Sequence, residues 1–117
     1  MKFNPKPEVY NTLKSLGYTC IQGNQATFKT EQIPAITFSV GSKSARYELD
    51  KTPSAYDVEI IVDVWANEST TASRIADEAE EAMREKDYLL TFSSDIPSPE
   101  GCLYHTNLRF AAVKIPK

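Results

Sequence analysis

The stretch YDVEIIVDVWAN, residues 56–67, constrains the fold of this chain more than any other segment. Read with the two-residue period of a β-strand, it places on one face Val58, Ile60, Val62 and Val64. The opposite face is mixed and carries Glu59, Ile61, Asp63 and Trp65. A water-exposed face does not need the two apolar side chains, and a fully buried face does not readily hold two carboxylates. We therefore expect a partly apolar, partly charged surface to cover this second face.

Directly after this strand, helical spacing predicts an amphipathic helix over residues 70–86, with Ser69 as its N-cap. Its apolar stripe consists mainly of alanine and comprises Ala72, Ile75, Ala76, Ala79, Ala82 and Met83. Because alanine side chains are short, the helix can lie close to a sheet, with little buried area per residue. We expect a thin contact layer here.

Before the central strand, the sequence predicts a helix over residues 5–16, with Asn4 as its N-cap and Gly17 as its stop. A weak hairpin over residues 18–30 would turn at Gly23 and Asn24. A strand over residues 35–40 follows, and Gly41 closes it. The polar segment around residues 42–53 is typical of a mobile or partner-dependent loop.

After the second helix, strands are predicted over residues 88–92 and 102–115, with a proline-rich loop between them. The last strand has an apolar face composed of Tyr104, Leu108, Phe110 and Ala112. Its other face carries His105, Asn107 and Arg109. The element order indicates an α+β fold: one compact domain over residues 1–117, with two helices and a mixed or mainly antiparallel sheet of four to five strands.

The composition narrows the classes of function. A formal net charge of -3 argues against a general phosphate-binding surface, because nucleic-acid-binding domains usually have an excess of Lys and Arg. No segment has the roughly 18 consecutive apolar residues typical of a membrane span, and the first ten residues lack the apolar stretch of a signal peptide. We expect no membrane association and a cytoplasmic protein.

Residues that could carry out catalysis are few. His105 could act as a general base if Asp57, Asp63 or Asp95 oriented it, but a histidine on the polar face of a strand is the commoner explanation. Cys20 and Cys102 have no metal-ligand spacing around them and are expected to be reduced, partly buried thiols. The acidic residues of the second helix point in several directions and indicate a solvated face. We expect no cofactor, no metal and no enzymatic activity.

Recognition is the other chemistry that the sequence could support. Trp65, Tyr88, Tyr104 and Arg109 are residue types enriched at interface hot spots. Two interpretations of Trp65 stay open: one of the helices covers it, or a partner does. In the polar segment, Arg46, Tyr47 and Leu49 would be the anchors if a partner orders it. The candidate interface residues are Arg46, Tyr47, Leu49, Glu59, Ile61, Asp63, Trp65 and Arg109.

The order of features resembles the small tail terminator, or tail completion, proteins of long-tailed bacteriophages and prophages. The matching segments are an N-terminal helix, the IPAITFSV strand, a polar excursion, then YDVEIIVDVWANESTTASRIADEAEEAM and a closing LYHTNLRFAAVKI strand. The resemblance covers residues 5–115, and its most specific element is the strand VEIIVDVWA running directly into a helix that begins with Ser and Thr.

The resemblance implies a non-enzymatic virion subunit, assembled in the host bacterial cytoplasm, that forms a six-membered ring at the head-proximal end of the tail tube. Such a ring stops addition of tube protein and offers a surface to the head-tail connector. DNA would pass through it without specific binding, and a net negative lumen would suit that passage. Two alternatives stay open: a head-completion or other neck protein of the same machine, and a small enzyme that uses His105 with a nearby carboxylate.

Overall fold

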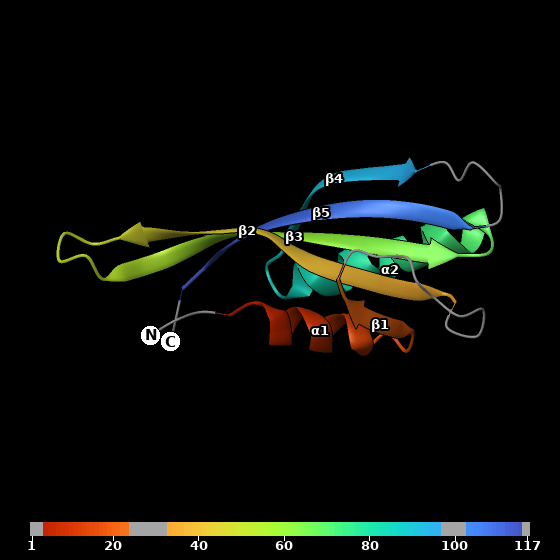
Figure 1. The fold of residues 1–117 in the computed structure, drawn as a ribbon, viewed down its shortest axis with the longest axis horizontal. Coiled ribbons are helices and arrows are strands. Elements are labelled where there is room, and N and C mark those ends of the chain that lie inside the picture. Colours follow the sequence, from red (N-terminus) through yellow and green to blue (C-terminus); the bar gives the residue numbers. More distant parts are fainter. Residues whose placement is uncertain (1–3, 24–32, 97–102, 116–117) are drawn as a thin grey trace.

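The computed structural model describes residues 4–23, 33–96 and 103–115. Within them the chain forms two helices and five strands in this order: α1 (Lys6–Lys14), β1 (Thr19–Gln22), β2 (Ala35–Tyr47), β3 (Pro53–Ala66), α2 (Ser69–Glu85), β4 (Leu89–Ile96) and β5 (Tyr104–Lys114). The strands make one mixed sheet in the order β1-β2-β3-β5-β4, parallel between β1 and β2 and antiparallel elsewhere (Figure 1). The predicted α+β class, with two helices and up to five strands, is confirmed.

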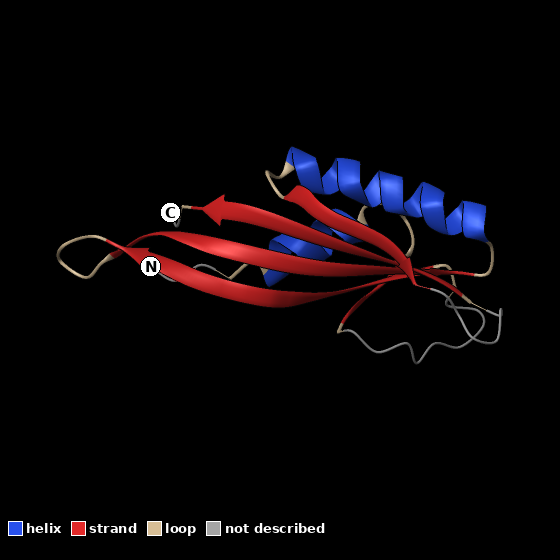
Figure 2. Cartoon of the chain, turned by 90° about the horizontal axis from the view of Figure 1, so that it is seen from above, coloured by secondary structure: helices blue, strands red, loops and turns tan. Residues whose placement is uncertain are grey.

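The apolar face of β3 forms the centre of the core, as its alternation predicts. Val58, Ile60, Val62 and Val64 are all buried, and they join one cluster with apolar residues of α1 and α2. α2 lies along one side of the sheet, as Figure 2 shows. We call the face that points away from α2 the second face of the sheet; β3 contributes to it Asp57, Glu59, Ile61, Asp63 and Trp65.

The alanine stripe of α2 lies against the sheet as expected. Ala72, Ala76 and Ala79 are buried together with Ile75 and Met83. The helix begins at Ser69, one residue earlier than predicted, and Glu68 occupies the N-cap position without a side-chain capping bond. The predicted role of Ser69 as N-cap is therefore wrong, because its backbone already belongs to the first helical turn.

α1 is shorter than predicted and ends at Lys14. The N-cap position belongs to Pro5, but the Asn4 Oδ1 atom still accepts a hydrogen bond of 3.2 Å from the Lys6 amide. Gly17, with a φ of 92°, takes the left-handed conformation that its place after the helix predicts. A buried tyrosine, Tyr88, ties α1 to the sheet by donating a hydrogen bond of 2.9 Å to Glu8.

The predicted hairpin over residues 18–30 is not what the described part forms. β1 pairs in parallel with β2, in the register Thr19 to Ala35. The second arm of that hairpin lies outside the described residues. The predicted proline-rich loop covers residues 96–101; its first residue, Ile96, belongs to β4, and the rest of it lies outside the described residues. The last strand is found where expected. Tyr104, which was predicted to lie on its apolar face, is exposed at the start of the strand, and Thr106 is buried instead.

The polar segment after Gly41 was predicted as a loop, and this prediction is wrong. β2 continues to Tyr47 and pairs with the beginning of β3, so residues 42–55 form a long hairpin that extends beyond the other strands (Figure 1). The register shifts between Val40 and Ser42, which makes Gly41 a bulge rather than an end. A Cβ atom at Gly41 would lie 2.5 Å from the Glu59 Oε1 atom, so glycine allows this close approach.

Candidate interaction surface

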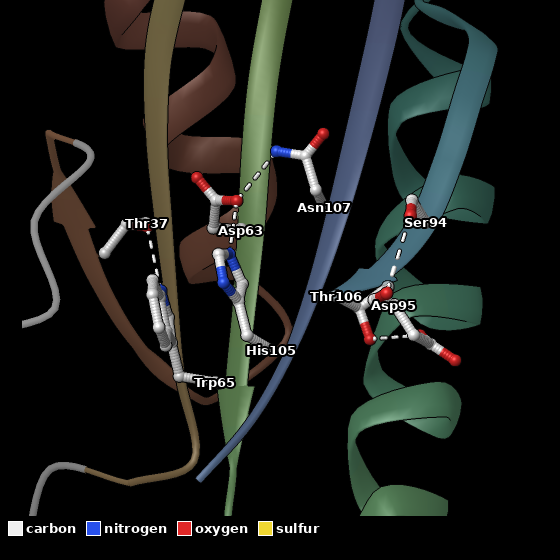
Figure 3. A network of polar contacts seen from close by, with 8 residues as sticks. All are labelled: Thr37, Asp63, Trp65, Ser94, Asp95, His105, Thr106 and Asn107. Carbon is white, nitrogen blue, oxygen red and sulfur yellow. Dashed lines mark hydrogen bonds and ion pairs between the residues drawn. The ribbon is translucent and has the colours of Figure 1, made fainter. Parts of the chain in front are cut away.

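The second face of the sheet carries a cluster of interacting polar and aromatic side chains at the end of β3. The Asp63 Oδ1 atom lies 2.6 Å from His105 Nε2 and accepts a hydrogen bond of 2.8 Å from Asn107 Nδ2. Trp65 stacks on the His105 ring at a centroid distance of 3.7 Å and donates a hydrogen bond of 3.1 Å to Thr37 Oγ1 (Figure 3). We call these five residues the polar cluster.

The sheet register explains why these residues meet. Trp65 is paired with His105, and Asp63 is paired with Asn107 on one side and with Thr37 on the other. Residues paired in an antiparallel sheet share a face, so three strands deliver their side chains to the same place. Asp63 is 5% exposed, and its contacts satisfy the carboxylate that the sequence places on a largely buried strand.

The cluster answers part of the question that the mixed face of β3 raised. Trp65 is half-buried, and it lies on the second face rather than in the core between sheet and helices. Its stacking on His105 and its hydrogen bond to Thr37 both join it to neighbouring strands of the sheet. The apolar and charged residues at this end of the face therefore cover one another in part.

The geometry brings His105 next to a carboxylate, one of the three that the sequence offered for a catalytic pair. The partner is Asp63; Asp95 instead accepts a hydrogen bond of 2.9 Å from Thr106, and Asp57 pairs with Arg46. The Asp63 carboxylate can orient the imidazole, but Trp65 covers one face of the ring. In the described residues, the structure records no hydroxyl or thiol hydrogen-bonded to the imidazole, and no group of three or more potential metal ligands. The arrangement holds the ring in place.

A second feature is the edge strand β4. All its residues are exposed except Ser94, which is half-buried, and the apolar ones include Leu89 at 58% and Phe92 at 52%. In the described residues, β4 pairs with β5 on one side and with no strand on the other. A long, apolar edge with unpaired backbone groups is a typical place for another chain to add.

The sequence did not identify β4 as an interaction surface. A register shift between Leu90 and Phe92 places Leu90 opposite Phe110, on the helix side, and Phe92 opposite Arg109, on the second face. Strict alternation would place these two side chains on one face, so the period-two pattern could not reveal their positions. The strand's place at the edge was not readable either, because it depends on the order of all five strands.

The hairpin of residues 42–55 is the third feature. Leu49 at its tip is 106% exposed and Tyr47 is 67% exposed. Arg46 forms two hydrogen bonds with Asp57, of 2.8 and 2.7 Å, across the hairpin. This ion pair lowers the pKa of the Asp57 carboxyl group and raises that of the Arg46 guanidinium.

Between the hairpin and β4, the second face is hollowed into a groove of about 610 Å³. Leu89, Ala111 and Val113 are apolar residues that line it, and Asp57 and Glu59 line it as well. The groove connects the two exposed features along one face of the sheet.

The eight predicted interface residues do not form one patch. Glu59, Ile61, Asp63, Trp65 and Arg109 share the second face, as their pairings require. Arg46, Tyr47 and Leu49 lie on the hairpin, away from the polar cluster. Tyr88, singled out as an interface residue type, is fully buried, and burial together with Glu8 raises its pKa.

Comparison with known proteins gives one kind of match. No protein-family model and no curated protein matches the sequence. Among solved structures, the fold is similar to a chain of a structure described as the virion of a native gene transfer agent particle, with a TM-score of 0.64 and 14% sequence identity. The match covers 92% of this chain and 92% of the other, so the two share a fold over nearly their whole lengths. In the described residues, no helix has the length and apolar character needed to cross a membrane.

Proposed function

We propose that this protein is a tail terminator: a structural virion protein that forms a six-membered ring at the head-proximal end of a phage or prophage tail tube. The observation that carries the proposal is the fold shared, over 92% of both chains, with a component of a virion particle. The sequence-level resemblance to tail terminators, over residues 5–115, points to the same kind of particle independently of the structural match. We infer the role from these two similarities together.

The surface of the molecule fits a subunit that works in an assembly. The β4 edge and the hairpin tip both expose large apolar side chains to solvent, and the two lie at different parts of the sheet. Large exposed apolar patches on a soluble protein typically mark interaction sites. A ring subunit needs two different contact surfaces, because each copy touches one neighbour on either side.

The proposed partners are further copies of this chain, the tail tube protein below the ring and the head-tail connector or neck proteins above it. The protein would be assembled in the cytoplasm of the bacterial host and retained in the virion at the head-proximal end of the tail. DNA would pass through the ring without specific binding. The net charge of -3 favours this passage, because a basic surface would bind the phosphate groups of DNA. The role needs no catalytic residue, cofactor or metal.

Interrupting the reading frame with a stop codon and imaging the particles by electron microscopy tests the proposal. A tail terminator predicts abnormally long tubes without heads, since nothing stops polymerisation. Tails of normal length that fail to join heads would instead support the alternative of a head-completion or neck protein. Intact, infectious particles would contradict any role in virion assembly.

The enzymatic alternative has one specific observation in its favour, the 2.6 Å contact between His105 and Asp63. Substituting His105→Gln separates the two functions. We expect assembly to stay nearly intact, because glutamine can keep a hydrogen bond to Asp63. A general base at this position predicts instead a loss of roughly 100-fold or more in an activity of the protein. Complementation of the stop-codon phage by the variant is the measurement, with the wild-type gene as control.

A further inference from the structure

We propose that consecutive subunits of the ring join edge to edge, with β4 of one copy pairing antiparallel with residues 39–47 of β2 in the next copy. This inference rests on the proposed function for the ring itself, and it names the surfaces that close it. The free edges of the sheet, their direction and the stagger between copies support this contact.

The sheet has two long free edges. β1 pairs with β2 along Ala35 to Phe38, so residues 39–47 of β2 have no strand beside them in the described part of the chain. β4 is free along Leu89–Ile96 at the other side of the sheet. The two free stretches are nine and eight residues long, which allows each to satisfy the backbone groups of the other.

The strand directions are compatible with a continuous sheet. β2 is antiparallel to β3, β3 to β5, and β5 to β4, so β4 runs parallel to β3 and antiparallel to β2. When identical sheets continue side by side, β4 of one copy therefore meets β2 of the next in antiparallel orientation. A contact that uses two different edges is heterologous and can close into a ring. Two-fold pairing of β4 with itself would leave the β2 edge of both copies open.

The apolar side chains of β4 also suit this contact. The exposed side chains of Leu89, Phe92 and Ile96 would then lie against the next subunit instead of water.

The pairing sets a stagger between neighbouring subunits. Leu89 lies level with Ser42 of its own chain, through its pairing with Ala111 and that residue's pairing with Glu59. In the proposed contact it would lie near Tyr47 of the neighbour, five residues further along the strand.

This stagger agrees with the geometry of closed sheets. β4 would pair directly with β2 of the next copy, so each copy contributes four strands, β2, β3, β5 and β4, to the closed sheet at this level. A displacement of five residues is about 17 Å, and the width of four strands is about 19 Å. Their ratio corresponds to strands tilted by about 42° from the ring axis, within the range that closed β-sheets adopt. Six such sheets would make a ring about 49 Å across at the backbone.

Paired cysteines test this contact in the full-length protein. Ser42 and Ser94 would face each other across the proposed interface, so the first double variant combines Ser42→Cys with Ser94→Cys. A second double variant combines Ser44→Cys with Ser94→Cys and would form the cross-link if the register differed by two residues. Cys102 is replaced by Ser. Cys20 is kept, because its thiol is buried and burial raises its pKa to about 11, which makes it a poor nucleophile at neutral pH.

Under oxidising conditions at high protein concentration, a double variant should give a ladder of covalent oligomers that ends at the full ring. Each single variant alone should stay monomeric on a denaturing gel, and a mixture of the Ser42→Cys and Ser94→Cys single variants should give dimers only. The matched control, Ser42→Cys with Glu81→Cys on the exposed side of α2, should give no ladder.

Several results would overturn the proposal. Rings visible by microscopy without cross-links in either double variant would place the interface elsewhere while leaving the ring in place. Covalent dimers from Ser94→Cys alone would indicate two-fold pairing of β4. If native mass spectrometry finds only monomers at the highest protein concentration that the method tolerates, this result also contradicts the edge contact. Tail length in the stop-codon phage decides the proposed function separately from all three.

Discussion

Asp63 is the residue on which the polar cluster depends, because its Oδ1 atom contacts both His105 and Asn107. Replacing Asp63 by Ala removes the partner of both side chains in a place that is almost closed to water. Leaving buried polar groups unsatisfied costs about 1–3 kcal/mol each, so we expect the free energy of unfolding to fall by at least about 1 kcal/mol. Urea denaturation measures this.

The matched control for that variant is Asp77→Ala on the exposed face of α2, where we expect a change within about 0.5 kcal/mol. If the two substitutions destabilise the protein equally, the cluster contributes nothing specific and His105 is held by its stacking on Trp65 alone.

The pair of Arg46 and Asp57 makes a prediction about pH. The guanidinium lowers the pKa of the Asp57 carboxyl group in the folded hairpin. Because the folded pKa is depressed, this contact stabilises the hairpin above the unfolded pKa of about 3.9 and is lost as the pH falls through the folded value. In an NMR titration, Asp57 should therefore titrate below about 3.9. The Arg46→Ala variant should move its midpoint upward, and an unchanged midpoint would show that the ion pair is absent in solution.

At the scale of the element, the thin layer between α2 and the sheet can be tested by overfilling it. Ala79 is fully buried, so Ala79→Leu inserts three extra carbon atoms into a packed contact. Overpacking of this kind typically costs about 1–3 kcal/mol, and we expect a loss of that size in the free energy of unfolding. Ser73→Leu, on the exposed side of the same helix, should change it by less than about 0.5 kcal/mol. Equal effects would mean that the helix does not lie close to the sheet.

The elements also show what the sequence could predict. The alternation of β3 and the helical spacing of α2 are long and regular, and both were located to within a few residues. Gly41 was misread as the end of a strand, because a glycine that allows a close approach at a bulge looks the same in sequence as a glycine that ends a strand. The polar residues beyond it suggested a loop, although a hairpin whose residues are mostly exposed needs no apolar alternation.

The candidate site was less predictable than the fold. The four candidates of β3, Glu59, Ile61, Asp63 and Trp65, were correctly expected to share a face, since alternation within one strand determines that. Only the pairing of Ile61 with Arg109 places Arg109 on the same face. The sequence named His105 as a potential partner of three carboxylates, but only the three-dimensional register selects Asp63 among them. The exposed edge of β4 could not be found at all, because it depends on strand order and on a bulge.

At the scale of the whole molecule, the long hairpin makes the protein elongated. The principal extents are 54 × 23 × 23 Å, and the radius of gyration is 15.4 Å. A compact chain of this length has a radius of gyration of about 13 Å. The hairpin therefore holds the exposed side chains of Tyr47 and Leu49 well away from the core.

The most direct test of the central claim is the length of tail tubes assembled from the tube protein of the same virus while purified protein is added in increasing amounts. We predict that mean tube length falls as the ratio of this protein to tube protein rises, with the protein at one end of each tube. The double variant Tyr47→Ser with Leu49→Ser should fold normally but lose this effect, whereas the exposed control Ile115→Ser should keep it. Tubes whose length does not respond to the wild-type protein would contradict the claim that it ends tube growth.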